Sequence, residues 1–248
     1  MIAICSDLDR TLIYSHRVPM PFPKVIAEYL DGRPQSYMTA RSLQFFRSLS
    51  KAVFFPVTTR TPEQFQRIHI FGSEIPYRAA LTCNGSILFE GGSSDQEWFE
   101  ESLRLGDAGF AEVKRIYSYL CEKYGDDHAH IYDPFFAYFV SDHVQDIADD
   151  LRRVADLSRV YIHNDRRKVY CYPHGLDKGT AIRRLRERFG ITKLLSSGDS
   201  VFDVPMLDAA DFAVAPDRLE QYVSNGHTLF CEGDIISDAF CDLIQQHI

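Results

Sequence analysis

The sequence has no hydrophobic run long enough to cross a membrane. Apolar stretches such as residues 53–57 and 135–140 are far shorter than the roughly 18 consecutive apolar residues that a transmembrane helix needs. Asp7 and Asp9 stand where the apolar region of a signal peptide would have to be, which argues against a secretory leader. We therefore expect a soluble, cytoplasmic protein without a membrane partner.

Clustered cysteines and an excess of basic charge are also missing. The six cysteines are scattered, with no C-x-x-C pair and no tight group of cysteines and histidines, as is typical of reduced, mostly buried thiols in a cytosolic protein. The formal net charge is −8, and residues 86–171 alone carry 10 Lys and Arg against 17 Asp and Glu. Because nucleic-acid binding relies on basic surfaces, a nucleic acid polymer is not an expected partner.

What is present is an ordinary globular composition. The chain has 248 residues, of which 45% are hydrophobic and 25% charged, without repeats or low-complexity tracts. This length is typical of one or two domains and is sufficient to bury a core without disulfides.

Short apolar runs alternate with amphipathic stretches at both ends of the chain. Strands are expected at 2–5, 52–57, 79–82, 194–197, 212–214 and 228–230, and helices at 39–51, 62–71, 177–189 and 235–246. This alternation predicts an α/β fold with a Rossmann-like parallel sheet and crossover helices.

The middle of the chain has a different pattern. Helices are expected at 111–124 and 144–154, a strand at 87–89, a strand at 135–140, and a hairpin of 159–163 and 168–172. The pattern predicts an α+β insert at residues 86–172, between two segments of one core domain, 1–85 and 173–248.

Three of the predicted buried strands run into loops with polar side chains. Asp7 and Asp9 follow the first strand, Thr58 follows the second, and Asp199 and Asp203 follow the strand at 194–197. Loops at the carboxyl ends of parallel strands lie at one edge of the sheet, where ligands bind, so these side chains are expected in one pocket. Taken singly, each residue has an ordinary structural explanation as a turn or cap residue; their order and spacing favour a shared site.

This set of residues is suited to phosphoryl chemistry. Carboxylates in one cleft repel one another unless a cation and a lysine, here Lys178, compensate them, and Mg²⁺ prefers such oxygen ligands. An ionised Asp7 can attack a phosphoryl group, while Asp9 can protonate the leaving oxygen and later deprotonate water. A hydroxyl such as that of Thr58 can hold a phosphoryl oxygen.

Four segments of the chain resemble the four motifs of the haloacid dehalogenase (HAD) superfamily. They are residues 7–12 (DLDRTL), 57–60 (VTTR), 175–179 (GLDKG) and 198–207 (GDSVFDVPML). Residues 84–85 and 210–215 also resemble the subgroup with a large C2-type cap between motifs two and three, which includes Cof-like and sucrose-phosphatase-like sugar-phosphate phosphatases. The resemblance implies a HAD-like core with residues 86–172 as an inserted cap.

Carried over residue by residue, the resemblance implies a role for each matching side chain. Asp7 is implied as phosphoryl acceptor and Asp9 as acid/base, and Thr58 and Lys178 as phosphate-binding residues. The implied Mg²⁺ ligands are Asp7, Asp9 through its backbone carbonyl, Asp199 and Asp203. Arg60 and Asn84 are implied near the substrate.

The chain departs from the family pattern at two positions. Arg10 stands where the family has glycine, a residue that tolerates positive φ, and we interpret this arginine as a substrate or structural residue. Phe202 replaces an asparagine, which removes a polar neighbour of the metal site. In the insert, Arg166 and Arg167 at the hairpin tip are candidate contacts for an anionic substrate group, with a solvated turn as the alternative.

The sequence therefore predicts a Mg²⁺-dependent phosphatase acting on a small phosphorylated metabolite, with a sugar phosphate as the expected substrate, through an aspartyl-phosphate. One alternative is a phosphomutase, which returns the phosphoryl group to the sugar. Another is a non-catalytic protein that binds a phosphorylated ligand on a phosphatase scaffold. The oligomeric state is not predicted.

Overall fold

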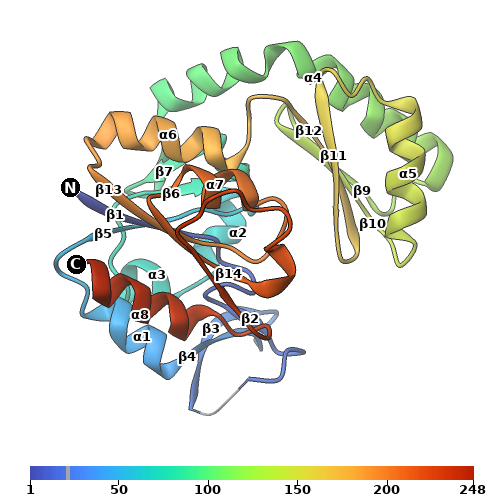
Figure 1. Cartoon of the computed structure of the whole chain (residues 1–248). Helices are drawn as coiled ribbons and strands as arrows, with labels where there is room; N and C mark the ends of the chain where they lie inside the picture. The colour runs from blue at the N-terminus through green and yellow to red at the C-terminus, as the bar shows by residue number, and fades with distance from the viewer. Residues whose placement is uncertain (21–22) are drawn as a thin grey trace. The chain divides into compact units, whose positions relative to one another are not determined.

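The computed structural model describes residues 1–20 and 23–248, which divide into two compact units (Figure 1). The core unit comprises Met1–Asp95 and Lys178–Ile248, and the insert unit comprises Gln96–Asp177. Strand β7 (Ile87–Glu90) pairs with β6 (Ala80–Thr82), and both lie in the core unit.

The core unit is built on a five-stranded sheet in the order β15-β14-β13-β1-β5, with every neighbouring pair parallel. Its strands are β1 (Ile2–Ser6), β5 (Val53–Pro56), β13 (Lys193–Ser197), β14 (Phe212–Pro216) and β15 (Thr228–Cys231). Ile4 at the centre faces Leu195 on one neighbour and Phe54 on the other, and all three are buried. The predicted α/β fold with a parallel sheet is confirmed.

Helices cover both faces of this sheet. They are α1 (Ala40–Arg47), α2 (Pro62–Gln66), α3 (Ile70–Ser73), α6 (Lys178–Phe189), α7 (Val204–Ala209) and α8 (Ser237–His247). Figure 1 shows α6 on one side of the sheet and α1 with α8 on the other. The single helix predicted at 62–71 is two short helices, and Gly72 in the second has a positive φ of 83°.

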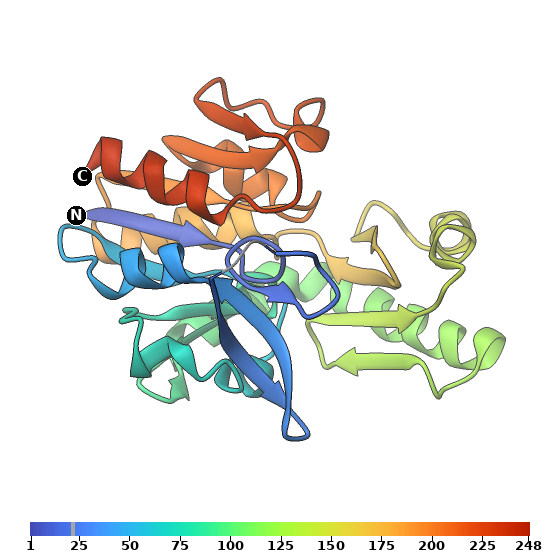
Figure 2. The same ribbon diagram turned by 90° about the horizontal axis from the view of Figure 1, so that it is seen from below.

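A three-stranded antiparallel sheet, missed by the sequence analysis, follows the first loop. It consists of β2 (Tyr14–Ser15), β4 (Arg33–Thr39) and β3 (Lys24–Leu30), in that order, and the β3–β4 hairpin is the blue ribbon extending downward in Figure 2. Asp31 and Gly32, the turn residues, both have positive φ. An Asp-Gly pair is a strong hairpin signal, so the sequence did contain the information.

The insert unit has four antiparallel strands in the order β11-β12-β10-β9, with two helices. Its elements are α4 (Gln96–Tyr124), β9 (Ala129–Tyr132), β10 (Phe136–Val140), α5 (Val144–Val154), β11 (Val160–Asp165) and β12 (Lys168–Pro173). The predicted hairpin and the helix at 144–154 are confirmed, whereas β9 was not predicted. Helix α4 begins well before residue 111, and Gly109 within it lets the helix approach Pro173 so closely that a Cβ would lie 2.6 Å from the proline Cβ.

Two further expectations can be compared with the structure. All six cysteines are free, as predicted. Among the residues described, no helix is both long and apolar enough to cross a membrane.

Candidate functional site

The loops after β1, β5 and β13 meet at one edge of the core sheet. The main-chain N–H of Asp7 donates to the carbonyl of Ser197 at 2.9 Å, and that of Val57 donates to Ser6 at 2.8 Å. These bonds continue the pairing of β1 with both neighbours one residue beyond the strands. The first, second and fourth motifs are therefore side by side, as the parallel topology predicts.

Lys178, the first residue of α6, joins two of these loops through a buried ion pair. Its Nζ donates to Asp7 Oδ1 at 2.6 Å and to Asp203 Oδ1 at 2.5 Å, and its side chain is only 1% exposed. Burial alone would lower the pKa of Lys178, but the Asp203 and Asp7 carboxylates outweigh it and the net shift is upward. The lysine therefore stays charged between the two carboxylates.

Burial and neighbouring carboxylates disfavour the ionised form of Asp7. Burial raises its pKa well above the ordinary value; Lys178 opposes this, and the carboxylates of Asp203, Asp199 and Asp9 add to it. Thr11 Oγ1 donates to the second carboxylate oxygen at 3.2 Å. One lysine therefore compensates only part of the negative charge around Asp7.

The loop after β13 folds around the Asp203 carboxylate. Asp203 Oδ2 accepts hydrogen bonds from the main-chain N–H of Asp199 at 3.0 Å and of Ser200 at 2.9 Å, and from Ser200 Oγ at 3.0 Å. A Cβ on Gly198 would lie 2.2 Å from the Asp203 Cβ, so this approach requires glycine. Asp203 thereby orients the loop that carries Asp199.

Three of the four predicted metal ligands come together. Asp7, Asp199 and Asp203 are buried, and each offers a carboxylate oxygen within 4.8 Å of the others. Buried carboxylate oxygens are the hard donors that Mg²⁺ prefers, so the residues present fit this ion. The carboxylate of Asp9 lies outside this cluster, and a metal contact through its backbone carbonyl stays a prediction.

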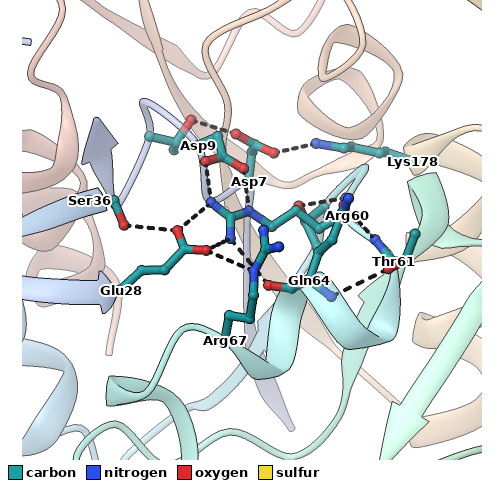
Figure 3. A network of polar contacts seen from close by, with 11 residues as sticks. Asp7, Asp9, Glu28, Ser36, Arg60, Thr61, Gln64, Arg67 and Lys178 are labelled. Carbon is teal, nitrogen blue, oxygen red and sulfur yellow. Dashed lines mark hydrogen bonds and ion pairs between the residues drawn. The ribbon is translucent and has the colours of Figure 1, made fainter. Parts of the chain in front are cut away.

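Instead, the Asp9 carboxylate forms a bidentate ion pair with Arg60 (Figure 3). Arg60 Nε donates to Asp9 Oδ2 at 2.7 Å, and Nη2 donates to Oδ1 at 2.8 Å. The remaining guanidinium N–H groups donate to Glu28 and to the carbonyl of Gln64. All five N–H donors of an arginine therefore have protein acceptors here. This arrangement favours holding Asp9 over the substrate contact predicted for Arg60.

Thr58 and Asn84 lie in two loops that are bonded to each other. The Thr58 N–H donates to the carbonyl of Leu81 at 2.8 Å, and the Asn84 N–H donates to that of Thr58 at 2.9 Å. Thr58 is buried, and its Oγ1 accepts the Arg60 N–H at 3.1 Å. Asn84 has a φ of 59°, a conformation that asparagine tolerates better than most residues. The backbone thus fixes both residues next to the end of β5.

Arg10 adopts a φ of 66°, as the glycine of the family pattern would permit. Its Nη2 pairs with Asp234 Oδ1 at 2.7 Å, and its Nε lies 3.8 Å from Asp199 Oδ2. Arg218 bridges the same two carboxylates, at 3.1 Å from Asp199 Oδ2 and 3.0 Å from Asp234 Oδ1. The sequence analysis missed Arg218 and Asp234, because neither lies in a motif.

Arg166 and Arg167 lie in the insert unit, at the turn between β11 and β12. Arg166 has a positive φ of 52°, and Arg167 Nε pairs with Asp142 at 2.6 Å. Their contact with a substrate stays a prediction. Phe202, the other departure from the family pattern, is buried in the core unit.

No protein-family model matches the sequence, and no curated protein is significantly similar to it. Solved structures, by contrast, match over almost the whole chain. The sucrose-phosphatase from Synechocystis sp. matches with a TM-score of 0.67 and 14% identity, covering 99% of this chain and 97% of that one. A sugar phosphatase of HAD subclass IIB matches with a TM-score of 0.64 and 16% identity, covering 99% and 98%.

A HAD phosphatase from Bacteroides thetaiotaomicron matches with a TM-score of 0.59 and 15% identity, covering 98% of this chain and 94% of that one. At these identities the likeness establishes the fold. The parallel core sheet agrees with this: the chain has the fold of these HAD phosphatases.

Proposed function

We propose that the chain is a Mg²⁺-dependent phosphatase that hydrolyses a small phosphorylated metabolite, with a sugar phosphate as substrate class. The observation that carries the proposal is the buried Asp7–Lys178–Asp203 ion pair with Asp199 in reach of a shared cation. The sugar phosphatases among the similar structures support the substrate class. Free cysteines throughout the chain support a cytoplasmic location.

Asp7 and Asp199, with Asp203 behind them, would hold the Mg²⁺ ion. When bound, Mg²⁺ supplies positive charge that screens the attacking carboxylate from the phosphoryl oxygens. Lys178 and Thr58 would bind the phosphoryl oxygens. The lysine Nζ already lies 2.6 Å from the attacking carboxylate. Both groups come from rigid element ends, which favours an oriented substrate.

In the first step an Asp7 carboxylate oxygen bonds to phosphorus, and the bond from phosphorus to the leaving oxygen breaks. The leaving oxygen takes a proton from Asp9, which yields the free alcohol and an aspartyl-phosphate. In the second step Asp9 takes a proton from water as the water oxygen bonds to phosphorus. Phosphate leaves, Asp7 is restored as carboxylate, and Asp9 is protonated again.

The test is phosphate release from phosphorylated sugars, nucleotides and p-nitrophenyl phosphate, with Mg²⁺ or with EDTA. We expect metal-dependent release that Asp7→Asn abolishes, and that Asp127→Asn, on an exposed aspartate outside the site, retains. Retained release in folded Asp7→Asn would contradict the mechanism. An isomeric sugar phosphate without free phosphate would favour the mutase, and ligand binding without any turnover would favour the binding protein.

A further inference from the structure

Glu28 is a buried carboxylate in none of the four motifs. It lies in β3 of the small antiparallel sheet, and its side chain is 1% exposed. Its oxygens accept from Arg60 Nη1 and Nη2, both at 3.0 Å, from Arg67 Nε at 3.3 Å and from Ser36 Oγ at 3.3 Å. Burying an unpaired charge is unfavourable, and these hydrogen bonds compensate for the burial of Glu28. What the buried carboxylate does at this position still requires an explanation.

A break in strand register turns Glu28 toward Arg60. Ile26 pairs with Tyr37, but Glu28 pairs with Ser36, so β3 has one extra residue at this point. Ala27 and Glu28 are consecutive and both buried, which an unbroken strand with alternating faces does not give. Such bulges re-aim side chains and occur next to active sites.

The Arg60 guanidinium connects Glu28 to Asp9. Figure 3 shows the two carboxylates against the same guanidinium, which binds each of them through two N–H···O bonds. Burial opposes the charge on Arg60, but the Asp9 and Glu28 carboxylates outweigh it and raise its pKa. Glu28 therefore fixes the plane in which Arg60 presents its donors to Asp9.

Asp9 is oriented by Arg60 and is partly exposed to solvent. Its side chain is 47% exposed, whereas that of Arg60 is 12% exposed. A proton donor needs this combination of a fixed orientation and access to the substrate.

We propose that Glu28 is a positioning residue for the proton transfer assigned to Asp9, and that it acts through Arg60. This inference rests on the proposed phosphatase function. It differs from a purely structural role in one respect: in the step that forms the aspartyl-phosphate, a misplaced Asp9 slows only substrates whose leaving oxygen needs a proton. The alcohol of glucose 6-phosphate is such a leaving group, whereas the nitrophenolate of p-nitrophenyl phosphate departs as an anion.

The test measures the rate of leaving-group release within one turnover on these two substrates in Glu28→Gln, because later turnovers include the water step, in which Asp9 acts for both substrates. The amide offers one acceptor where the carboxylate offers two, so Arg60 loses one of its four bonds to the carboxylates. We expect this rate to fall by about tenfold on glucose 6-phosphate and to change by less than about twofold on p-nitrophenyl phosphate. Arg60→Lys, which keeps the charge but not the two-sided geometry, should give the same split and carries the test if Glu28→Gln does not fold.

Arg67→Met is the matched control, because Arg67 contacts Glu28 but lies off the path to Asp9; it should leave the ratio of the two rates unchanged. Equal losses on both substrates in Glu28→Gln and Arg60→Lys would overturn the inference and leave Glu28 a structural residue. Absence of phosphate release by the unaltered protein from every phosphorylated compound of the panel, with Mg²⁺ present, would instead contradict the proposed function itself.

Discussion

The buried charge of Lys178 leads to a testable prediction about the thermal stability of the protein. Lys178→Met removes the cation between Asp7 and Asp203, which lie 2.6 Å and 2.5 Å from its Nζ. Methionine fills a similar volume, so the principal change is electrostatic. The two carboxylates then face each other in a buried site without a counter-charge, while the hydrogen bonds from the loop to Asp203 remain.

Removing one partner of a buried ion pair costs about 3–5 kcal/mol of unfolding free energy. Solvent does not screen this interaction appreciably, because the Lys178 side chain is 1% exposed. For a chain of 248 residues, each kcal/mol corresponds to roughly 2–4 °C in Tm. We therefore expect Lys178→Met to lower Tm in EDTA by about 6–20 °C.

The assay is thermal unfolding of the unaltered protein and of Lys178→Met, in EDTA and in saturating Mg²⁺. A divalent cation between the same carboxylates should raise the Tm of the variant more than that of the unaltered protein. Lys51→Met, on an exposed lysine, is the control and should leave Tm nearly unchanged. A Tm for Lys178→Met in EDTA equal to that of the control would refute the electrostatic account of the site.

Two other substitutions test different parts of the structure. Arg10→Gly removes a cation beside Asp199 and should tighten Mg²⁺ binding by about tenfold, measured by titration calorimetry; weaker binding would contradict the charge argument. In the insert unit, hydrogen bonds, that of Lys123 first, hold the pKa of Asp150 at about 2, below its ordinary value of 3.8. The resulting stabilisation is present above about pH 4 and is lost as the pH falls toward 2. Asp150→Asn should therefore lower Tm by about a few degrees at pH 7 and much less near pH 2, and an equal drop at both would contradict it.

The sequence contained the core fold because its core strands carry short apolar runs. Residues 2–5 and 194–197 read as strands buried on both faces, and such strands occur in parallel sheets covered by helices. That topology places Asp7, Thr58 and Asp199 at one edge of the sheet. This grouping can be predicted without knowledge of side-chain geometry. The predicted grouping of these residues was therefore within reach of pattern analysis.

The side chains that contact these residues could not be predicted from the sequence pattern. Glu28 lies in a strand whose register breaks, and its neighbours give no clean alternation of polar and apolar residues. Arg218 reaches Asp199 from a turn after β14, and Asp234 pairs with it from a loop beyond β15. Such contacts depend on where side chains of separate loops end in space, which spacing along the chain does not encode.

The most direct test of the central claim is whether Asp7 carries the phosphoryl group. The protein would be mixed with substrate and Mg²⁺, quenched in acid within one turnover, digested, and its peptides analysed by mass spectrometry. The proposed mechanism predicts a phosphoryl adduct on the peptide that contains Asp7, and none in Asp7→Asn. Rapid phosphate release with no adduct at any time point, or an adduct on another residue, would contradict it.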